Sequence, residues 1–311
     1  MVVSRDVHGE RPTVQIPLEK VGLTGIKMPL SFTKFEGKDV VIVPSFDVYI
    51  DLPAERRGID ASRSYEVIAE VFNAFAKKVL KIEDICAAIA EELLKRHEYA
   101  SRAEVKARAE AIFERRTPQT GMLTYEPYEV MAGATSKLLN SKIETRKMVG
   151  VKVIGITACP CVREALQEAS VKEASESLNY VEDQARTLIN RLPIATHMQR
   201  SEGEAMIEVP EGFNVDVTDL IRIVEKALSA STFELLKRKD EVALVLTAMS
   251  NPRFVEDSIR LMAKGVVDHF KHFPDDVKVR LSIRSRESVH KHDLVAVRNT
   301  SLGQLRREVL G

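Results

Sequence analysis

Two cysteines flank a proline in the segment ITACPCVREA, residues 156–165, of a chain of 311 residues that contains only three cysteines. So few cysteines exclude a disulfide framework. Proline is disfavoured inside a central strand, so we expect the chain to leave a sheet here and to present its thiols at an edge. The roles open to Cys159 and Cys161 are core packing, metal ligation and nucleophilic attack. Cys86, on an apolar helical face, is interpreted as a packing residue.

Histidines supply a second set of reactive groups. His290 and His292 stand two residues apart in ESVHKHDL, directly after an alternating segment. If that strand continues, both imidazoles face the same side, roughly 7 Å apart; the alternative is an exposed strand end with two solvated rings. His197 lies in the polar segment ATHMQRSEGE. With Cys159 these residues form a ligand set suited to Zn²⁺ or Fe²⁺, and their dispersion along the chain favours a catalytic over a structural site. The remaining histidines are interpreted as surface residues: His8, His97, His269 and His272.

Two acidic residues come next. Glu241 follows LLKRKD and is expected to open a strand, whereas Glu256, in NPRFVED, is expected in the first turn of a helix. A carboxylate there is usually no more than a favourable partner of the helix dipole. By composition, the basic segments ERRGIDASR and LLKRK are ordinary solvated charge. The sequence contains no phosphate-binding glycine loop, serine triad or nucleotide-binding glycine fingerprint.

Composition narrows the class of protein. The chain has 46 basic and 46 acidic residues, which argues against nucleic-acid binding through bulk charge. No apolar run approaches the roughly 20 residues of a spanning helix, and the N-terminal segment lacks the apolar core of a signal peptide. We therefore expect a cytoplasmic protein with no nucleic-acid or membrane partner.

The elements that must position these residues follow from periodicity. In the first half we expect a buried strand at 39–52, a polar loop at 53–63 and a strand at 147–158. Between them, helical spacing predicts a helix from residue 64 and a second one after it. The apolar stripes are Val67, Ile68, Val71, Phe72, Phe75, Val79 and Leu80 in the first helix, and Ile85, Ile89 and Leu93 in the second. A third helix is expected at 101–116, where SRAE fits a capping box.

The second half repeats this theme. We expect helices at 218–228 and 251–270, a strand at 241–249 and a strictly alternating strand at 277–285. Each half thus has strands, then helices, then strands. This pattern predicts an α+β fold with antiparallel sheet and a possible internal duplication whose boundary lies near 145–160.

Taken together, seven segments resemble those of the type IB GTP cyclohydrolases, a family that includes the archaeal MptA-type enzymes, and they occur in the same order. They are VGLTGIKMPL, DLPAERRGIDASR, ITACPCVREA, THMQRS, LLKRKDE, NPRFVED and ESVHKHD. The resemblance covers almost the whole chain. CPCVRE and HMQRS stand where the bacterial pattern has CPCSKE and HNQRS, and 35 residues separate Cys161 from His197. These departures favour the MptA branch.

The resemblance implies a tunnelling fold (T-fold) of two tandem modules, each an antiparallel sheet backed by helices. The modules are expected at 1–158, with a helical insertion near 84–118, and at 159–311. The resemblance also implies a homo-oligomer, a dimer or tetramer, with active sites between subunits.

Carried over motif by motif, the resemblance assigns Cys159 as the catalytic and metal-binding cysteine. It assigns His197 as a metal ligand and Glu241 as a further ligand. His290 and His292 match a pair close to the metal, and we expect one of them to transfer protons.

Glu256 matches the carboxylate that anchors the purine, which replaces its interpretation as a dipole partner. Guanine offers N1–H and the 2-amino group side by side, and a carboxylate can accept both. The triphosphate needs cations, for which the candidates are Arg56, Arg57, Arg63, Arg200, Lys237 and Arg238.

The implied activity is a metal-dependent GTP cyclohydrolase of methanopterin or folate biosynthesis. It opens the imidazole ring of guanine, releases formate and forms 7,8-dihydroneopterin 2′,3′-cyclic phosphate, using one Fe²⁺ per site, with Mn²⁺ or Zn²⁺ as alternatives. The bacterial-type product, 7,8-dihydroneopterin triphosphate, stays open. So does a T-fold purine-binding enzyme that uses Cys159 as a nucleophile without metal, as the nitrile reductases of this fold do. The non-enzymatic alternative is a purine sensor or scaffold with a structural zinc clip.

Overall fold

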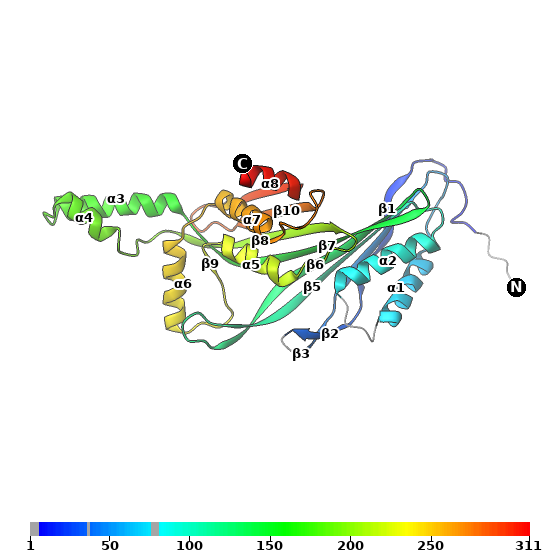
Figure 1. Ribbon diagram of the computed structural model, residues 1–311, viewed down its shortest axis with the longest axis horizontal. Coiled ribbons are helices and arrows are strands. Elements are labelled where there is room, and N and C mark those ends of the chain that lie inside the picture. Colours follow the sequence, from blue (N-terminus) through cyan, green and yellow to red (C-terminus); the bar gives the residue numbers. More distant parts are fainter. Residues whose placement is uncertain (1–5, 36–37, 76–80) are drawn as a thin grey trace. The chain divides into compact units, whose positions relative to one another are not determined.

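The computed structural model describes residues 6–35, 38–75 and 81–311 (Figure 1). The strands are β1 (Leu18–Lys27), β2 (Leu30–Phe35), β3 (Lys38–Ile42), β4 (Ser45–Leu52), β5 (Arg102–Arg116), β6 (Leu123–Leu139), β7 (Lys142–Ala158), β8 (Met198–Pro210), β9 (Ala230–Ser231), β10 (Lys278–Ser285) and β11 (Leu294–Ser301). The helices are α1 (Ala61–Phe75), α2 (Ile82–Arg96), α3 (Pro160–Glu176), α4 (Glu182–Ile189), α5 (Val217–Ala227), α6 (Arg238–Ser250), α7 (Val255–His269) and α8 (Leu302–Leu310).

The order of elements repeats along the chain. The series β1, β4, α1, α2, β5, β6 is followed by β7, β8, α5, α7, β10, β11, so each series has two strands, two helices and two strands. The elements β2 and β3 interrupt the first series, α3, α4, β9 and α6 interrupt the second, and α8 follows it. The strand order in the main sheet is β1-β4-β5-β6-β7-β8-β10-β11, with β9 paired to β7. The predicted α+β class with antiparallel sheet backed by helices is confirmed.

The chain forms two compact units. The first comprises Met1–Ala111, Glu129–Gly150 and Ile207–Val215, and the second comprises Ile112–Tyr128, Val151–Met206 and Asp216–Gly311. The predicted division after residue 158 stays a prediction. The second series of elements begins after the β6–β7 turn, where Asn140 and Ser141 have φ of 50° and 63°.

In the first unit, β4 pairs antiparallel with β1 and β5. The strand predicted at 39–52 is two strands, because Pro44 lacks the N–H that would continue the ladder. The alternate residues Phe46, Val48, Ile50 and Leu52 of β4 are buried. The ring of Phe72 in α1 meets Phe46 edge to face, with centroids 5.2 Å apart.

Both predicted helices of this unit are confirmed as α1 and α2. Val79 and Leu80 of the predicted stripe lie outside the described residues. Cys86 of α2 is fully buried, as expected of a packing residue, and burial raises the pKa of its thiol.

The predicted third helix is wrong, because residues 102–116 form the strand β5. Its apolar residues alternate with charged ones, so Ala103, Val105 and Ala107 are buried while the charged side chains between them take the opposite face. The Ser101 hydroxyl, expected to cap a helix, donates instead to the carboxylate of Asp51 at 2.5 Å. Alternation with period two and an existing edge at β4 therefore outweigh the helix propensity of alanine and glutamate. The expected helical insertion near 84–118 is helical only in its α2 part.

In the second unit, α5 and α7 pack together and cover the sheet. A Cβ on Gly203 of β8 would lie 2.5 Å from Cγ1 of Val224 in α5 and 2.9 Å from Cε of Met262 in α7. The missing side chain is therefore what lets both helices approach the strand. The strand predicted at 277–285 is confirmed as β10, with Val279, Leu281 and Ile283 buried.

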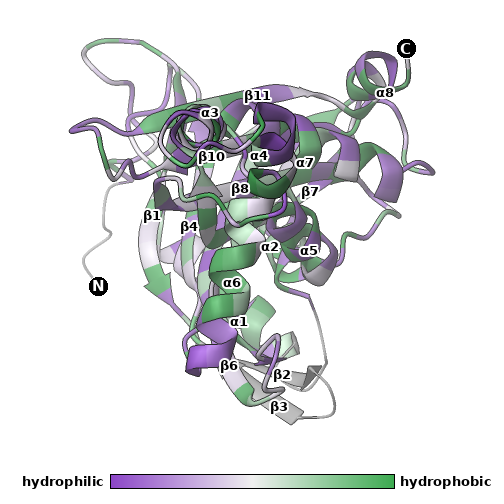
Figure 2. Cartoon of the chain, turned by 90° about the vertical axis from the view of Figure 1, so that its left-hand side faces the viewer, coloured by the Kyte–Doolittle hydropathy of each residue, from purple (hydrophilic) through white to green (hydrophobic). Residues whose placement is uncertain are grey.

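The strand predicted at 241–249 is also wrong, because this segment belongs to α6. A short apolar run cannot be assigned to a strand or a helix by periodicity alone. This segment is helical because the buried carboxylate of Asp240 anchors the first turn of α6. The helix, drawn mostly in green in Figure 2, leaves Val242 and Leu246 exposed. Within the described ranges, no helix combines the length and the apolar character needed to cross a bilayer.

Candidate active site

Cys159 and His197 lie side by side in the second unit. Cys159 follows β7 and is the N-cap residue of α3, with Pro160 in the first turn. Its N–H donates to the carbonyl of His197 at 3.1 Å, and the hydroxyl of Thr196 donates to the carbonyl of Cys159 at 2.7 Å. The chain therefore leaves the sheet at Cys-Pro-Cys as predicted. After α3 and α4 it returns at His197 to the end of β7.

The start of α7 joins these two residues. The N–H of Arg253 donates to the carbonyl of Ala158 at 2.9 Å, and the N–H of Ala158 donates to Oγ of Ser229 at 3.1 Å. Glu256 follows three residues later, exposed in the first turn of α7 as predicted. Three of the predicted site residues, Cys159, His197 and Glu256, thus come from segments tied together by backbone hydrogen bonds.

His290 and His292 lie in the loop between β10 and β11. The strand ends at Ser285, so of the two alternatives the structure shows the exposed strand end and not the strand continued through both histidines. Their rings stack with centroids 5.2 Å apart and an interplanar angle of 15°, and both residues are exposed. The loop starts next to β8, because the N–H of Arg286 donates to the carbonyl of Arg200 at 2.9 Å.

Glu241 occupies the first turn of α6 and not the start of a strand. Within the described ranges, a single group of three or more potential metal ligands has all its ligand atoms within 4.8 Å of one another, and it does not contain Cys159, His197 or Glu241. The side chains predicted as one metal site are therefore not assembled as a trio within one chain. A thiolate, an imidazole and a carboxylate still form a donor set that fits Fe²⁺ or Zn²⁺, and Cys159 and His197 are adjacent.

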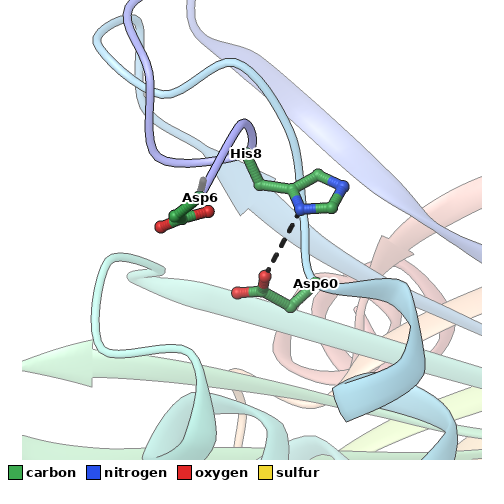
Figure 3. A group of neighbouring side chains, drawn as sticks. All are labelled: Asp6, His8 and Asp60. Carbon is green, nitrogen blue, oxygen red and sulfur yellow. Dashed lines mark ion pairs between the residues drawn. The ribbon is translucent and has the colours of Figure 1, made fainter. Parts of the chain in front are cut away.

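The group of potential ligands that does come together is Asp6, His8 and Asp60 in the first unit (Figure 3). His8 Nδ1 lies 3.7 Å from Asp60 Oδ1. Oδ2 of Asp60 pairs with Arg56 at 3.0 Å and with Arg63 at 3.5 Å. Two guanidinium groups already balance the charge of this carboxylate, so the cluster is interpreted as an ion-pair network before α1.

The basic residues predicted to bind the triphosphate differ in whether they already have a carboxylate partner. Arg57, like Arg56 and Arg63, has a carboxylate partner in the first unit, Glu10 at 3.4 Å. In the second unit Arg200, Lys237 and Arg238 are exposed, and they form no ion pair with any residue in the described part of the chain. Their charges are thus available to a ligand.

The expectation that His97 is a surface residue is wrong. It is fully buried at the end of α2, with Nε2 3.0 Å from Ser64 Oγ and Nδ1 2.9 Å from the hydroxyl of Tyr99. Burial lowers its pKa, and nearby Arg63 lowers it further. The guanidinium of Arg56 lies 4.0 Å from the ring centroid of Tyr99. His97 is therefore a neutral core residue that connects α1 and α2.

Sequence reasoning missed two polar residues at this site, Gln199 and Glu287. Oε1 of Gln199 lies 3.0 Å from Nδ1 of His197, and Nε2 of Gln199 donates to Oε1 of Glu287 at 3.1 Å. The side chain of Glu287 is only 3% exposed. Gln199 lies inside the THMQRS segment and Glu287 opens ESVHKHD, but nothing in their spacing along the chain indicates that they meet.

Asp240 holds α6 in place. Its buried carboxylate accepts from the N–H groups of Gln119 and Thr120, each at 2.9 Å, from the Thr120 hydroxyl at 2.6 Å and from the N–H of Lys237 at 3.1 Å. Burial acts to raise the pKa of this carboxyl, but the hydrogen bonds outweigh it and the pKa lies well below its usual range. This anchor makes the segment helical and fixes the position of neighbouring Glu241.

We expect Asp240→Asn to lower the melting temperature at pH 7 by several degrees. Because the folded-state pKa is depressed, the ionised carboxylate stabilises the protein above its unfolded-state pKa of about 3.9, and this contribution is lost as pH falls. The difference in stability between wild type and Asp240→Asn should therefore shrink below about pH 4. Thermal unfolding between pH 2 and 7 measures it. Asp183→Asn, an exposed first-turn acid of α4, is the control and should change nothing.

Comparison with known proteins agrees with this fold. The chain aligns with solved uricases from Arthrobacter globiformis (TM-score 0.52, 8% identity, 93% of this chain and 96% of that one) and Bacillus fastidious (TM-score 0.51, 11% identity, 94% and 96%). The protein therefore has the T-fold. Residues 5–296 match the family described as type I GTP cyclohydrolase folE2, and the chain belongs to this family.

Curated relatives cover nearly the full length. The chain is 40% identical to GTP cyclohydrolase MptA 2 of Methanocella arvoryzae over 98% of both chains. It is 39% identical to GTP cyclohydrolase MptA of Methanococcus aeolicus, over 98% of this chain and 99% of the relative. The protein is thus an enzyme of the GTP cyclohydrolase class and resembles its MptA-type branch.

Proposed function

We propose that the protein is a metal-dependent, type IB GTP cyclohydrolase that opens the imidazole ring of guanine, releases formate and forms 7,8-dihydroneopterin 2′,3′-cyclic phosphate. The sequence resemblance to the MptA-type branch implies this product, and the relatives named GTP cyclohydrolase MptA support the placement in that branch. The observation that carries the proposal is the convergence of the Cys159, His197 and Glu256 segments at one end of β7.

In this proposal Cys159, His197 and Glu241 hold Fe²⁺, with Mn²⁺ or Zn²⁺ as alternatives. Such an ion makes water reactive at neutral pH. Since these three side chains do not form a close group in the described part of one chain, the proposal places the complete site between subunits of a homo-oligomer.

The remaining residues bind and orient GTP. The carboxylate of Glu256 accepts N1–H and the 2-amino group of guanine, which sets the position of the ring atom C8. Arg200, Lys237 and Arg238 attract the triphosphate, and this role is supported for them over Arg56 and Arg63 because they form no ion pair with another described residue. The stacked imidazoles of His290 and His292 are exposed and able to exchange protons with substrate. The cytoplasmic location predicted from the sequence remains a prediction.

Anaerobic turnover of GTP tests the proposal, with Fe²⁺, Mn²⁺ and Zn²⁺ supplied separately, formate measured, and the pterin product identified by mass. We expect turnover that a chelator abolishes while circular dichroism shows the fold retained. The mass decides between cyclic phosphate and triphosphate. Turnover unaffected by chelation would instead support Cys159 as a metal-free nucleophile, and unfolding on metal removal would support a structural clip.

A further inference from the structure

We propose that Glu287 is a positioning residue that acts through Gln199 to place the proton of neutral His197 on Nδ1, leaving the lone pair of Nε2 free to bind a metal. The importance of this lone pair for catalysis rests on the proposed function, but the tautomer itself does not.

The first step concerns the carboxylate. Glu287 follows β10, and its nearly buried Oε1 accepts from Ser285 Oγ at 2.9 Å and from Gln199 Nε2 at 3.1 Å. Its other oxygen lies 4.0 Å from His197 Nδ1, and no arginine or lysine in the described ranges pairs with this acid. An ionised carboxylate can only accept hydrogen bonds, so every polar group facing it must present a proton.

The second step concerns the amide. Nε2 of Gln199 has two hydrogens, one for Glu287 and one for Oγ1 of Thr157 at 3.3 Å. If the amide were reversed, its oxygen would face the carboxylate, two acceptors would meet without a hydrogen, and a buried charge would lose a partner. The charge of Glu287 therefore determines the amide orientation, which places Oε1 of Gln199 against His197.

The third step concerns the imidazole. Oε1 of Gln199 lies 3.0 Å from Nδ1 of His197, and an amide oxygen accepts only, so Nδ1 carries the hydrogen. In the neutral ring Nε2 is then the unprotonated nitrogen. A hydrogen-bond acceptor on the second nitrogen is the usual way in which proteins fix the tautomer and orientation of a metal-binding histidine.

A chain of buried hydroxyls keeps the carboxylate in place. Thr157 Oγ1 lies 2.7 Å from Ser201 Oγ and 3.1 Å from Ser285 Oγ, and all three residues are almost fully buried. Because Ser285 donates to Glu287 and Thr157 accepts from Gln199, the hydroxyl protons can all run from Ser201 through Thr157 and Ser285 to the carboxylate. The network joins the ends of β7, β8 and β10 around a single negative charge.

Nitrogen-15 NMR of metal-free protein at about pH 8, where an ordinary histidine is neutral, reads the tautomer directly. His197→Asn assigns the signals. In wild type we expect His197 to carry its proton on Nδ1.

Glu287→Leu and, independently, Gln199→Leu should each shift the population toward the Nε2–H form, which free histidine prefers. Glu287→Gln, which keeps an acceptor oxygen but not the charge, should shift it less. Glu204→Gln, an acid of β8 that accepts from Ser282 at 3.2 Å, is the matched control and should leave it unchanged.

Anaerobic titration with Co²⁺, followed by its thiolate absorption, provides a second measurement. We expect Glu287→Leu to weaken Co²⁺ binding roughly 10- to 100-fold, as is typical when a partner of a metal ligand is removed, and Glu204→Gln to leave it unchanged. An unchanged His197 tautomer in both leucine variants overturns the proposal. Loss of Co²⁺ binding in Glu287→Leu with the wild-type tautomer also overturns it, since Glu287 would then be a ligand itself. Because neither measurement uses GTP, failure of the wild type to turn over GTP contradicts only the proposed function.

Discussion

Cys159→Ala should lower kcat for GTP ring opening on the order of a thousandfold or more, because it removes a metal ligand at the reacting centre. Cys159 is the N-cap residue of α3, and its N–H donates to the carbonyl of His197, a second proposed ligand. Formate release in anaerobic assays with saturating Fe²⁺ measures the effect. Bound metal, determined on the same samples, should fall in parallel.

Cys161→Ala is the matched control. Its thiol is exposed in the first turn of the same helix, and alanine is a good helix former, so kcat and stability should stay near wild type. Turnover that survives in Cys159→Ala, or that is lost equally in Cys161→Ala, would show that the role of the thiol has been assigned to the wrong residue.

Glu256→Ala should weaken GTP binding roughly a hundredfold, since two hydrogen bonds to a charged acceptor contribute on the order of 3 kcal/mol. Glu256 is exposed in the first turn of α7 and accepts no internal hydrogen bond recorded for the described residues. Its removal should cost the fold only a few tenths of a kcal/mol of dipole interaction. Calorimetric titration of metal-free protein with GTP gives Kd, and thermal unfolding verifies the fold.

Inosine triphosphate, which lacks the 2-amino group, makes this experiment specific. Wild type should bind it at least tenfold more weakly than GTP, because one hydrogen bond to the carboxylate is lost. Glu256→Ala should bind both nucleotides equally. If the variant still prefers GTP by the wild-type ratio, another group recognises the guanine edge.

The two wrong assignments of secondary structure have one physical origin. Residues 101–116 have helix-forming residue types, and 241–249 have strand-forming ones, yet they fold as β5 and α6. Local propensity is worth a few tenths of a kcal/mol per residue, so a neighbouring strand edge or a buried anchor outweighs it. For β5 the decisive partners are β4 and the carboxylate of Asp51, and for α6 the anchor is Asp240.

Some residues of the candidate site could be predicted from the sequence, and others could not. Cys159, His197 and Glu256 could be selected from motifs because their residue types carry chemistry and the segments around them are distinctive. Gln199 and Glu287 could not be linked, because they are 88 residues apart and no local spacing relates the two segments in which they lie. His97 looked like a surface residue, since imidazole is polar and only its contacts with Ser64 and Tyr99 explain its burial.

By itself the sequence determined the α+β class, the helices α1, α2, α5 and α7, and the chemical identity of the reactive groups, since these depend on periodicity and residue type. Tertiary structure alone decided that the Cys159 and His197 segments meet, and that the buried carboxylate of Glu287, two residues after β10, reaches the imidazole through Gln199. Contacts between distant segments depend on strand pairing and on the burial of charge, and these are properties of the folded chain that no local pattern encodes.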